Sequence, residues 1–112
     1  MRVLVCGGRD YDDEDAVRAE LQSLPPCTIV HGDARGADRL ADRIAAEMFI
    51  VTEPHPADWT RYGKAAGPIR NQEMLDSGIN LVIAFPGGSG TADMVRRARK
   101  AGITIREVDT WL

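Results

Sequence analysis

Short apolar runs alternate with polar and glycine-rich segments along the whole chain. The first run covers residues 3–6 and stops at two consecutive glycines, Gly7 and Gly8. Runs of this length are typical of strands that helices bury on both faces. Similar apolar-rich runs predict four further strands, over residues 28–31, 49–52, 81–85 and 103–108.

Helical patterns lie between these predicted strands. Asp12 is a candidate N-cap for a first helix that has an acidic first turn and ends before Pro25. The period is clearest in the second helix, where apolar residues recur every three or four positions at Ala37, Leu40, Ala41, Ile44, Ala45 and Met48. A third helix is predicted from Pro68 to the stop signal Gly78. The last helix is predicted to end before Gly102 and to bury four apolar side chains, those of Met94, Val95, Ala98 and Ala101.

The order of these elements predicts an α/β fold. Strands that alternate with helices form right-handed crossovers and a parallel, doubly wound sheet, here of five strands in the order 3-2-1-4-5. Residues 54–68 are the exception, because three prolines and two glycines without a sustained period predict a long loop. The 112 residues and the hydrophobic fraction of 44% suit one domain over residues 1–112.

Composition narrows the classes of function. The formal charge of -3 is spread over interspersed acids and bases, so the chain lacks the basic surface typical of duplex nucleic-acid binders. Cys6 and Cys27 lack metal-ligand spacing and are expected to be reduced thiols. The first apolar run is too short for a signal peptide or a membrane span. We therefore expect a cytoplasmic protein without a metal or a cofactor.

The ends of the first and fourth predicted strands carry the main candidate site. In an open parallel sheet the ligand binds where the strand order reverses, which here falls between these two strands. Both strands end in a glycine pair, Gly7-Gly8 and Gly87-Gly88, and residues 89–91 begin a helix whose amides attract anions. These features predict a phosphate-binding cradle. Alternatively, the glycines only make tight turns between strand and helix.

The loop after the second strand adds a third glycine-containing segment, residues 31–38, to this edge of the sheet. Asp33 and Asp38 are either ligand-binding groups or, respectively, a cap for the next helix and a partner for its dipole. His31 is expected to be a half-buried, hydrogen-bonding residue, and His55 to be structural or exposed.

The irregular segment and the helix after it carry aromatic and cationic residues. Trp59 and Tyr62 suit stacking on a base, and Arg70 is the preferred charged contact to a phosphate. Alternatively, Trp59 is a core residue under the loop. The basic run over residues 96–100 lies in the last turns of its helix and is expected to be a solvated face.

Three segments together resemble the SLOG superfamily, and specifically its small YspA-like, YpsA-related branch. They are residues 7–11, 32–38 and 86–91, and residues 56–59 and 67–74 are also similar to that branch. The resemblance implies a Rossmann-like fold and binding of nucleotides or nucleotide-derived ligands, often in bacterial or phage conflict systems. The candidate ligand-binding residues are Gly7, Gly8, Arg9, Asp33, Arg35, Gly36, Asp58, Trp59, Arg70, Asn71, Pro86, Gly87, Gly88, Ser89, Gly90 and Thr91.

The chain is also similar to the Lonely Guy phosphoribohydrolases, which cleave the N-glycosidic bond of nucleoside monophosphates. Residues 70–74 match their Arg-Lys-x-x-Met pattern in part, and residues 86–91 match the start of Pro-Gly-Gly-x-Gly-Thr-x-x-Glu. Met94 stands where that pattern has the catalytic glutamate, and a thioether neither exchanges protons nor stabilises an oxocarbenium charge. If the chain is an enzyme, the candidate catalytic residues are Arg70, Asp93 and Glu73, and Met94→Glu is expected to raise activity.

A third similarity joins residues 34–38 to a loop of DprA-like proteins, whose fold binds single strands. The acidic balance argues against this function, because single-strand grooves combine basic tracks with several stacking aromatics. Sensing or sequestration of a nucleotide is the favoured function, ahead of N-glycoside hydrolysis and of single-strand binding. Related proteins often pair through helices, so we expect a homodimer with residues 68–77 as the candidate interface.

Overall fold

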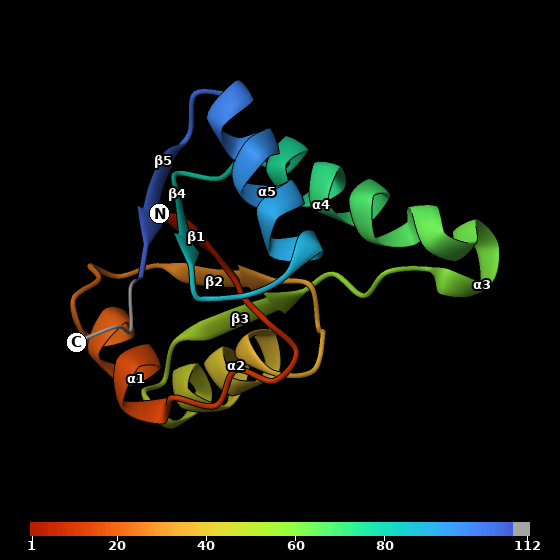
Figure 1. The fold of residues 1–112 in the computed structure, drawn as a ribbon. Coiled ribbons are helices and arrows are strands. Elements are labelled where there is room, and N and C mark those ends of the chain that lie inside the picture. The colour runs from red at the N-terminus through yellow and green to blue at the C-terminus, as the bar shows by residue number, and fades with distance from the viewer. Residues whose placement is uncertain (109–112) are drawn as a thin grey trace.

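The computed structural model describes residues 1–108, which form a parallel sheet with helices on both faces (Figure 1). The five strands are β1 (Arg2–Cys6), β2 (Thr28–His31), β3 (Val51–Pro54), β4 (Leu81–Ala84) and β5 (Thr104–Glu107). The helical elements are α1 (Glu14–Gln22), α2 (Ala37–Glu47), α3 (Trp59–Tyr62), the 3-10 turn η1 (Gly63–Ala65), α4 (Ala66–Asp76) and α5 (Ser89–Lys100). The strand order is β3-β2-β1-β4-β5, which confirms the predicted doubly wound topology.

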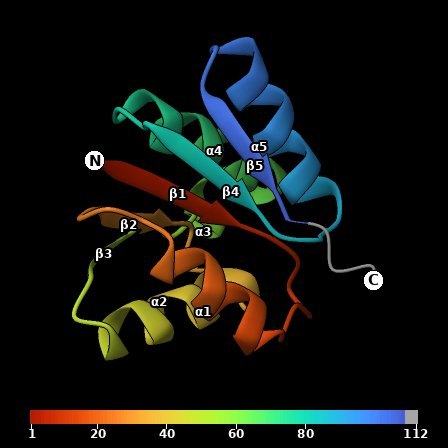
Figure 2. The same cartoon turned by 90° about the vertical axis from the view of Figure 1, so that its left-hand side faces the viewer.

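The two faces of the sheet carry separate apolar cores. Figure 2 shows α1 and α2 on one face and α4 and α5 on the other. Alternate residues of β1 supply both cores, because successive side chains of a strand point to opposite faces. Val3 and Val5 pack on the side of α1 and α2, whereas Leu4 and Cys6 pack on the side of α4 and α5. Each fully buried aliphatic side chain contributes about 1.5–3 kcal/mol, so the central strand anchors both layers.

The first helix starts one residue later than predicted. Asp13, not Asp12, is its N-cap, and the Asp13 carboxylate accepts a hydrogen bond from the Ala16 amide at 3.1 Å. Composition does not distinguish two adjacent aspartates. Packing does, because the buried positions Val17 and Leu21 fix the phase of the helix on the sheet.

The predicted strand over residues 49–52 is wrong at its start. Phe49 lies directly after α2 with φ 59° and is 97% exposed. The Phe49 amide donates to the Ala46 carbonyl oxygen and the Ile50 amide to that of Ala45, at 3.1 and 2.8 Å. These bonds close the C-terminus of the helix in the Schellman manner. Strand β3 therefore begins only at Val51.

The predicted long loop over residues 54–68 is also wrong in part. Asp58 caps the single-turn helix α3, η1 follows it, and α4 already begins at Ala66, before Pro68. Elements this short show no sustained period in a sequence. Another correction concerns Ala101, which was predicted to point inward but lies exposed after the end of α5.

The longest single α-helix among residues 1–108 is short compared with the thickness of a bilayer. Helix α5 has 12 residues. Within residues 1–108 no helix is long and apolar enough to cross a membrane.

Candidate functional site

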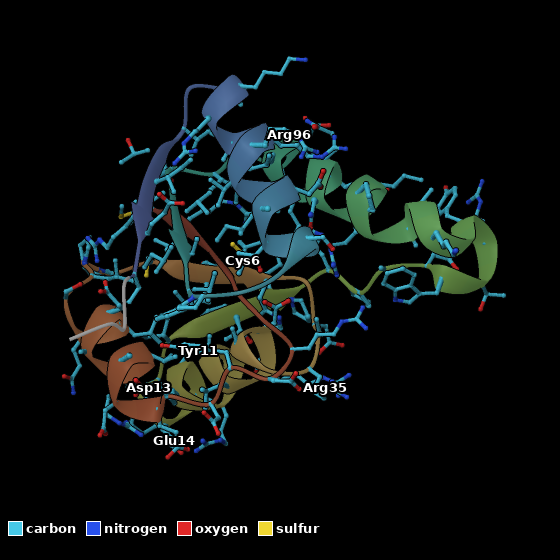
Figure 3. All side chains as sticks on the ribbon, in the orientation of Figure 1. Cys6, Tyr11, Asp13, Glu14, Arg35 and Arg96 are labelled. Atoms are coloured by element: carbon cyan, nitrogen blue, oxygen red, sulfur yellow. The ribbon has the colours of Figure 1, made fainter. Side chains whose placement is uncertain are left out.

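A broad cleft of about 1440 Å³ lies at the carboxyl ends of β1, β2 and β4. This position is the topological switch point of the sheet, because the chain leaves β1 towards β2 on one side and returns to β4 on the other. In Figure 3, Cys6 at the end of β1 lies between Arg96 on α5 and Arg35 on the loop after β2. All three residues line the cleft. The cleft is larger than the 300–1,000 Å³ usual for small-ligand sites and has room for a nucleotide.

Three glycine-containing loops meet at the floor of the cleft. The Gly8 amide donates to the Pro86 carbonyl oxygen at 2.9 Å, and the Ala37 amide donates to the Gly8 carbonyl oxygen at 3.1 Å. A Cβ atom on Gly87 would lie 2.6 Å from the Gly8 nitrogen, and one on Gly36 would lie 2.5 Å from the Arg9 carbonyl carbon. These glycines therefore allow close contact between loops, and the Gly8 amide is not free for a ligand.

Gly88 and Gly90 differ from the other glycines of these loops. A Cβ atom at either position would have no heavy atom within 4 Å, so both face the open cleft. The hydrogen bonding of α5 starts with the Ala92 amide, which donates to the Gly88 carbonyl oxygen at 3.0 Å. The amides of residues 89–91 precede that bond and have no acceptor among residues 1–108. Such amides at a helix N-terminus favour an anion.

The loop after β2 is held by two buried side chains. His31 is completely buried, more deeply than predicted, and its Nδ1 accepts a hydrogen bond from the Asp33 amide at 3.0 Å. Its Nε2 lies 2.6 Å from the Asp42 carboxylate, so the ring proton belongs on Nε2. Asp38 accepts hydrogen bonds from the amides of Gly32 and Ala34 at 3.1 and 3.2 Å.

Asp33 is not the helix cap that its position in the sequence suggested. The N-cap of α2 is Gly36, with φ 88° and no side-chain cap bond. Asp33 has φ 55°, and its carboxylate lies 3.6 Å from the Arg39 guanidinium. Asp33 is therefore free of the helix terminus and lines the cleft.

Arg70 connects α4 to the loop after β2. Its Nη1 donates to the Gly32 carbonyl oxygen at 2.5 Å, and its Nε donates to the Asn71 side-chain oxygen at 3.2 Å. Burial lowers the pKa of Arg70, the nearby Asp38 carboxylate raises it, and Arg9 lowers it.

Asp93 connects α5 to α4. Its side chain accepts hydrogen bonds from Asn71 at 3.0 Å and from Arg97 at 2.9 Å, and it also pairs with Arg96. Burial by itself would raise the pKa of Asp93, but the bonds from Asn71 and Arg97 outweigh it and hold the pKa below its usual value. Both carboxylate oxygens are thus engaged, and Asp93 is ionised at neutral pH.

Asp38 and Cys6 form a buried pair of ionisable groups beside the cleft. Burial raises the pKa of the Asp38 carboxyl, and the backbone amide of Ala34 opposes that shift. Burial, together with the nearby Asp38 carboxylate, raises the pKa of Cys6 to about 12. The thiol therefore stays protonated at neutral pH and is a poor nucleophile.

The arginines fall into two groups, those with and those without a carboxylate partner. Within residues 1–108 most arginines form an ion pair with a carboxylate, namely Arg2, Arg18, Arg35, Arg39, Arg43, Arg96, Arg97, Arg99 and Arg106. Arg9, Arg61 and Arg70 form no such pair in this part of the chain. Arg9 and Arg70 both line the cleft, as does Lys64. The cleft thus has positive charge in excess.

The predicted basic face on α5 is only partly solvated. Arg97 is half-buried and donates hydrogen bonds to Asp93 and to the Gln72 side-chain oxygen at 2.9 and 3.0 Å. Arg96 is exposed and lines the cleft. This helix face therefore joins α5 to α4 instead of only facing water.

The structure brings most of the predicted site residues to this one cleft. Its lining includes Gly7, Gly8, Arg9, Asp33, Arg35, Trp59, Arg70, Asn71, Pro86, Gly87, Gly88, Ser89, Gly90, Thr91 and Asp93. Three candidates lie elsewhere: Gly36 packs against Gly8 and Arg9, Asp58 caps α3, and Glu73 is exposed on α4. Trp59 is 49% exposed, so it is not a core residue under the loop.

Several cleft residues were missed from the sequence, including Arg39 and Arg96. Arg96 could have been found from helical spacing. It lies seven residues, or about two turns, after Ser89 and therefore on the same face of the helix. Arg39 follows the loop after β2 within the first turn of α2.

The fold and this cleft define a Rossmann-like α/β protein with an open cleft at the switch point of its sheet. A family model described as "YspA, cpYpsA-related SLOG family" matches residues 1–62. "Gene 61 protein" of Mycobacterium phage D29 is 46% identical to the chain over 116 aligned residues, which cover 93% of each protein. The chain belongs to the YspA, cpYpsA-related SLOG family.

Proposed function

We propose that the cleft binds a nucleotide or nucleotide derivative through a phosphate group, for sensing or sequestration. The observation that carries this proposal is the set of free amides at the start of α5, in the same cleft as Arg70, which forms no ion pair within residues 1–108. A phosphate at the start of α5 would accept hydrogen bonds from these amides and gain a charge-assisted hydrogen bond from Arg70.

Membership of the SLOG family supports a nucleotide-related ligand. The name of the phage relative states no activity. A part in bacterial or phage conflict therefore stays a prediction from the resemblance.

N-glycoside hydrolysis, the second candidate, has less support from the arrangement of carboxylates. Met94 is 1% exposed in the core between the sheet, α4 and α5. Asp93 reaches the cleft, but three donors engage it. A general acid needs a proton to give near neutral pH, and an ionised, fully bonded Asp93 has none. Glu73 points to solvent from α4.

Isothermal titration calorimetry with the four nucleoside monophosphates and with dinucleotides tests the proposal on Gly88 variants. Gly88→Asp places a carboxylate beside the start of α5 and is expected to abolish binding by repelling the phosphate. Gly88→Asn is the matched control of nearly equal size without the charge. The position has open space and φ -100°, so both variants are expected to fold.

The proposal is wrong if no nucleotide of the panel binds the wild type, or if Gly88→Asp binds as tightly as Gly88→Asn.

Homodimer formation through α4 stays a separate prediction. The exposed positions of α4 include Pro68, Glu73 and Asp76, which offer little apolar surface. Analytical ultracentrifugation with and without the bound nucleotide measures the oligomeric state.

A further inference from the structure

We propose that the cleft holds the base of its nucleotide between the indole ring of Trp59 and the guanidinium of Arg9. This inference rests on the proposed function and assigns the two ends of the ligand. The phosphate lies at the start of α5 near Arg70, and the planar base lies at the α3 side of the cleft. Trp59 and Arg9 both line the cleft, and the Arg9 Cζ atom lies 5.9 Å from the centre of the Trp59 ring.

The packing of α3 supports a role in presenting Trp59. All four residues of α3 are exposed, so the helix adds nothing to either core. Figure 1 shows α3 at the far end of α4, away from the sheet. An isolated turn of helix is unstable in water, so its order depends on local contacts. The Asp58 carboxylate supplies one of these contacts by accepting a hydrogen bond from the Arg61 amide at 3.1 Å.

Gly67 on α4 supplies the second contact. A Cβ atom at this position would lie 3.3 Å from the Trp59 Cη2 atom, so the bare backbone of α4 lies directly against the edge of the indole. This contact fixes the ring beside the helix while leaving it 49% exposed. A large aromatic side chain that is held in place and half exposed in a cleft offers a stacking surface at low entropic cost.

The distance between Arg9 and Trp59 would accommodate a base after a small movement of the Arg9 side chain. Stacked planar groups are separated by about 3.5 Å, so a base between the two side chains needs about 7 Å. The observed 5.9 Å is about 1 Å short of that spacing. Arg9 is exposed, and its side chain makes no hydrogen bond or ion pair within residues 1–108. It is therefore free to move by that amount and to stack on the outer face of the base.

The test compares a ligand with a base and a ligand without one. In a Trp111→Phe background Trp59 is the only tryptophan, because the chain has two. Adenosine, guanosine, cytidine and uridine monophosphates are titrated while the tryptophan fluorescence and the heat of binding are followed. Ribose 5-phosphate, which keeps the phosphate and sugar, is the matched probe. The base-bearing probes are expected to quench Trp59, and ribose 5-phosphate to leave it unchanged.

Variants then assign the affinity to the ring. Trp59→Ala should weaken binding of the best monophosphate by about 5- to 150-fold, the range for losing one base stack, and leave binding of ribose 5-phosphate unchanged. Trp59→Phe should lose less affinity for the monophosphate than Trp59→Ala. Tyr62→Ala is the matched control, because Tyr62 is the other aromatic residue of α3 and does not line the cleft. It should change the affinity for neither ligand.

Each alternative result decides against a specific statement. If the monophosphates bind the wild type but Trp59→Ala weakens binding of neither the monophosphates nor ribose 5-phosphate, the base site is wrong and the proposed function stands. The same conclusion holds if Trp59→Ala weakens both kinds of probe equally, because the ring then shapes the cleft without contacting a base. If no probe binds the wild type, the proposed function and the base site both fail.

Discussion

Asp93 and Met94 are neighbours on α5 but face opposite environments. The Asp93 carboxylate lies at the cleft, tied to Asn71 on α4, whereas the Met94 side chain is 1% exposed in the core of this face of the sheet. One residue turns a helix by about 100°, which is enough to move a side chain from cleft to core. The position that aligns with the catalytic glutamate of the Lonely Guy enzymes is thus an interior position of this protein.

Met94→Glu is therefore expected to destabilise the protein instead of creating a hydrolase. A carboxylate there would be buried among Leu4, Val82 and Ala84 without a described partner, at a cost of at least about 2 kcal/mol. Urea unfolding measures this loss. Met94→Leu, which keeps the volume, should cost less than about 1.5 kcal/mol. Release of free base from a nucleoside monophosphate by a stably folded Met94→Glu protein would contradict this expectation.

Removal of Arg70 should weaken nucleotide binding by about 1.5–3 kcal/mol, the range for a hydrogen bond to a charged group. Arg70→Lys should recover only part of the affinity, because an ammonium cannot form a two-pronged contact. Loss of the bond to the Gly32 carbonyl oxygen should also lower the free energy of unfolding by about 1 kcal/mol. Calorimetry and urea unfolding measure the two effects separately.

Arg61→Ala is the matched control for Arg70→Ala, because it removes the same charge from an arginine outside the cleft lining. If both variants weaken binding equally, the effect belongs to the overall charge and the assigned contact is wrong. Repeating the titrations at raised salt strengthens the comparison, since screening reduces long-range attraction more than a direct contact.

The sheet could be predicted from the sequence because its central strands are buried on both faces. Continuous apolar runs mark β1 and β4, and glycines mark where each strand ends. The failure at Phe49 has the opposite cause. An apolar residue reads as part of a strand whether it is buried or, as here, 97% exposed beyond the end of a helix. Helix α3 was missed because it buries nothing and so leaves no periodic pattern.

The position of the cleft could also be predicted from the sequence, but the partners of its side chains could not. In a sequence, a glycine that faces an open cleft looks the same as one that packs against another loop. Gly88 faces the cleft, whereas Gly87 packs against Gly8. The unpaired state of Arg70 depends on which residues surround it. Its main partner, Gly32, is 38 residues away in the chain, and no local pattern reports such a contact.

Glu53 should make the protein sensitive to acid. Two hydrogen bonds from Arg2, at 2.8 and 2.7 Å, and a contact with His55 lower the pKa of Glu53 from 4.5 to about 2. Since the pKa is lower in the folded state, this stabilisation is present above about pH 4.5 and is lost as the pH falls towards 2. Glu53 is partly exposed, so solvent screening limits the effect to about 1 kcal/mol.

Urea unfolding of Glu53→Gln at several pH values between 7 and about 2 tests this link, because the variant should lose stability less steeply over the acidic range. Arg2→Ala and the double variant complete a mutant cycle that isolates the Arg2–Glu53 interaction. If Glu53→Gln and the wild type lose stability equally steeply as the pH falls, this ion pair does not contribute to the acid sensitivity.

Phe49→Gly should stabilise the protein by about 1 kcal/mol, because residue 49 adopts the left-handed conformation that favours glycine after a helix. The ring is 97% exposed, so its removal loses almost no buried surface within the protomer. Phe49→Ala separates the two contributions, since it removes the ring but keeps the Cβ atom that causes the strain, and it should leave the free energy of unfolding nearly unchanged. Urea unfolding at two protein concentrations measures both variants. A loss of stability in both variants that grows with protein concentration would show instead that Phe49 is buried between copies of the chain, because only contacts between copies depend on concentration.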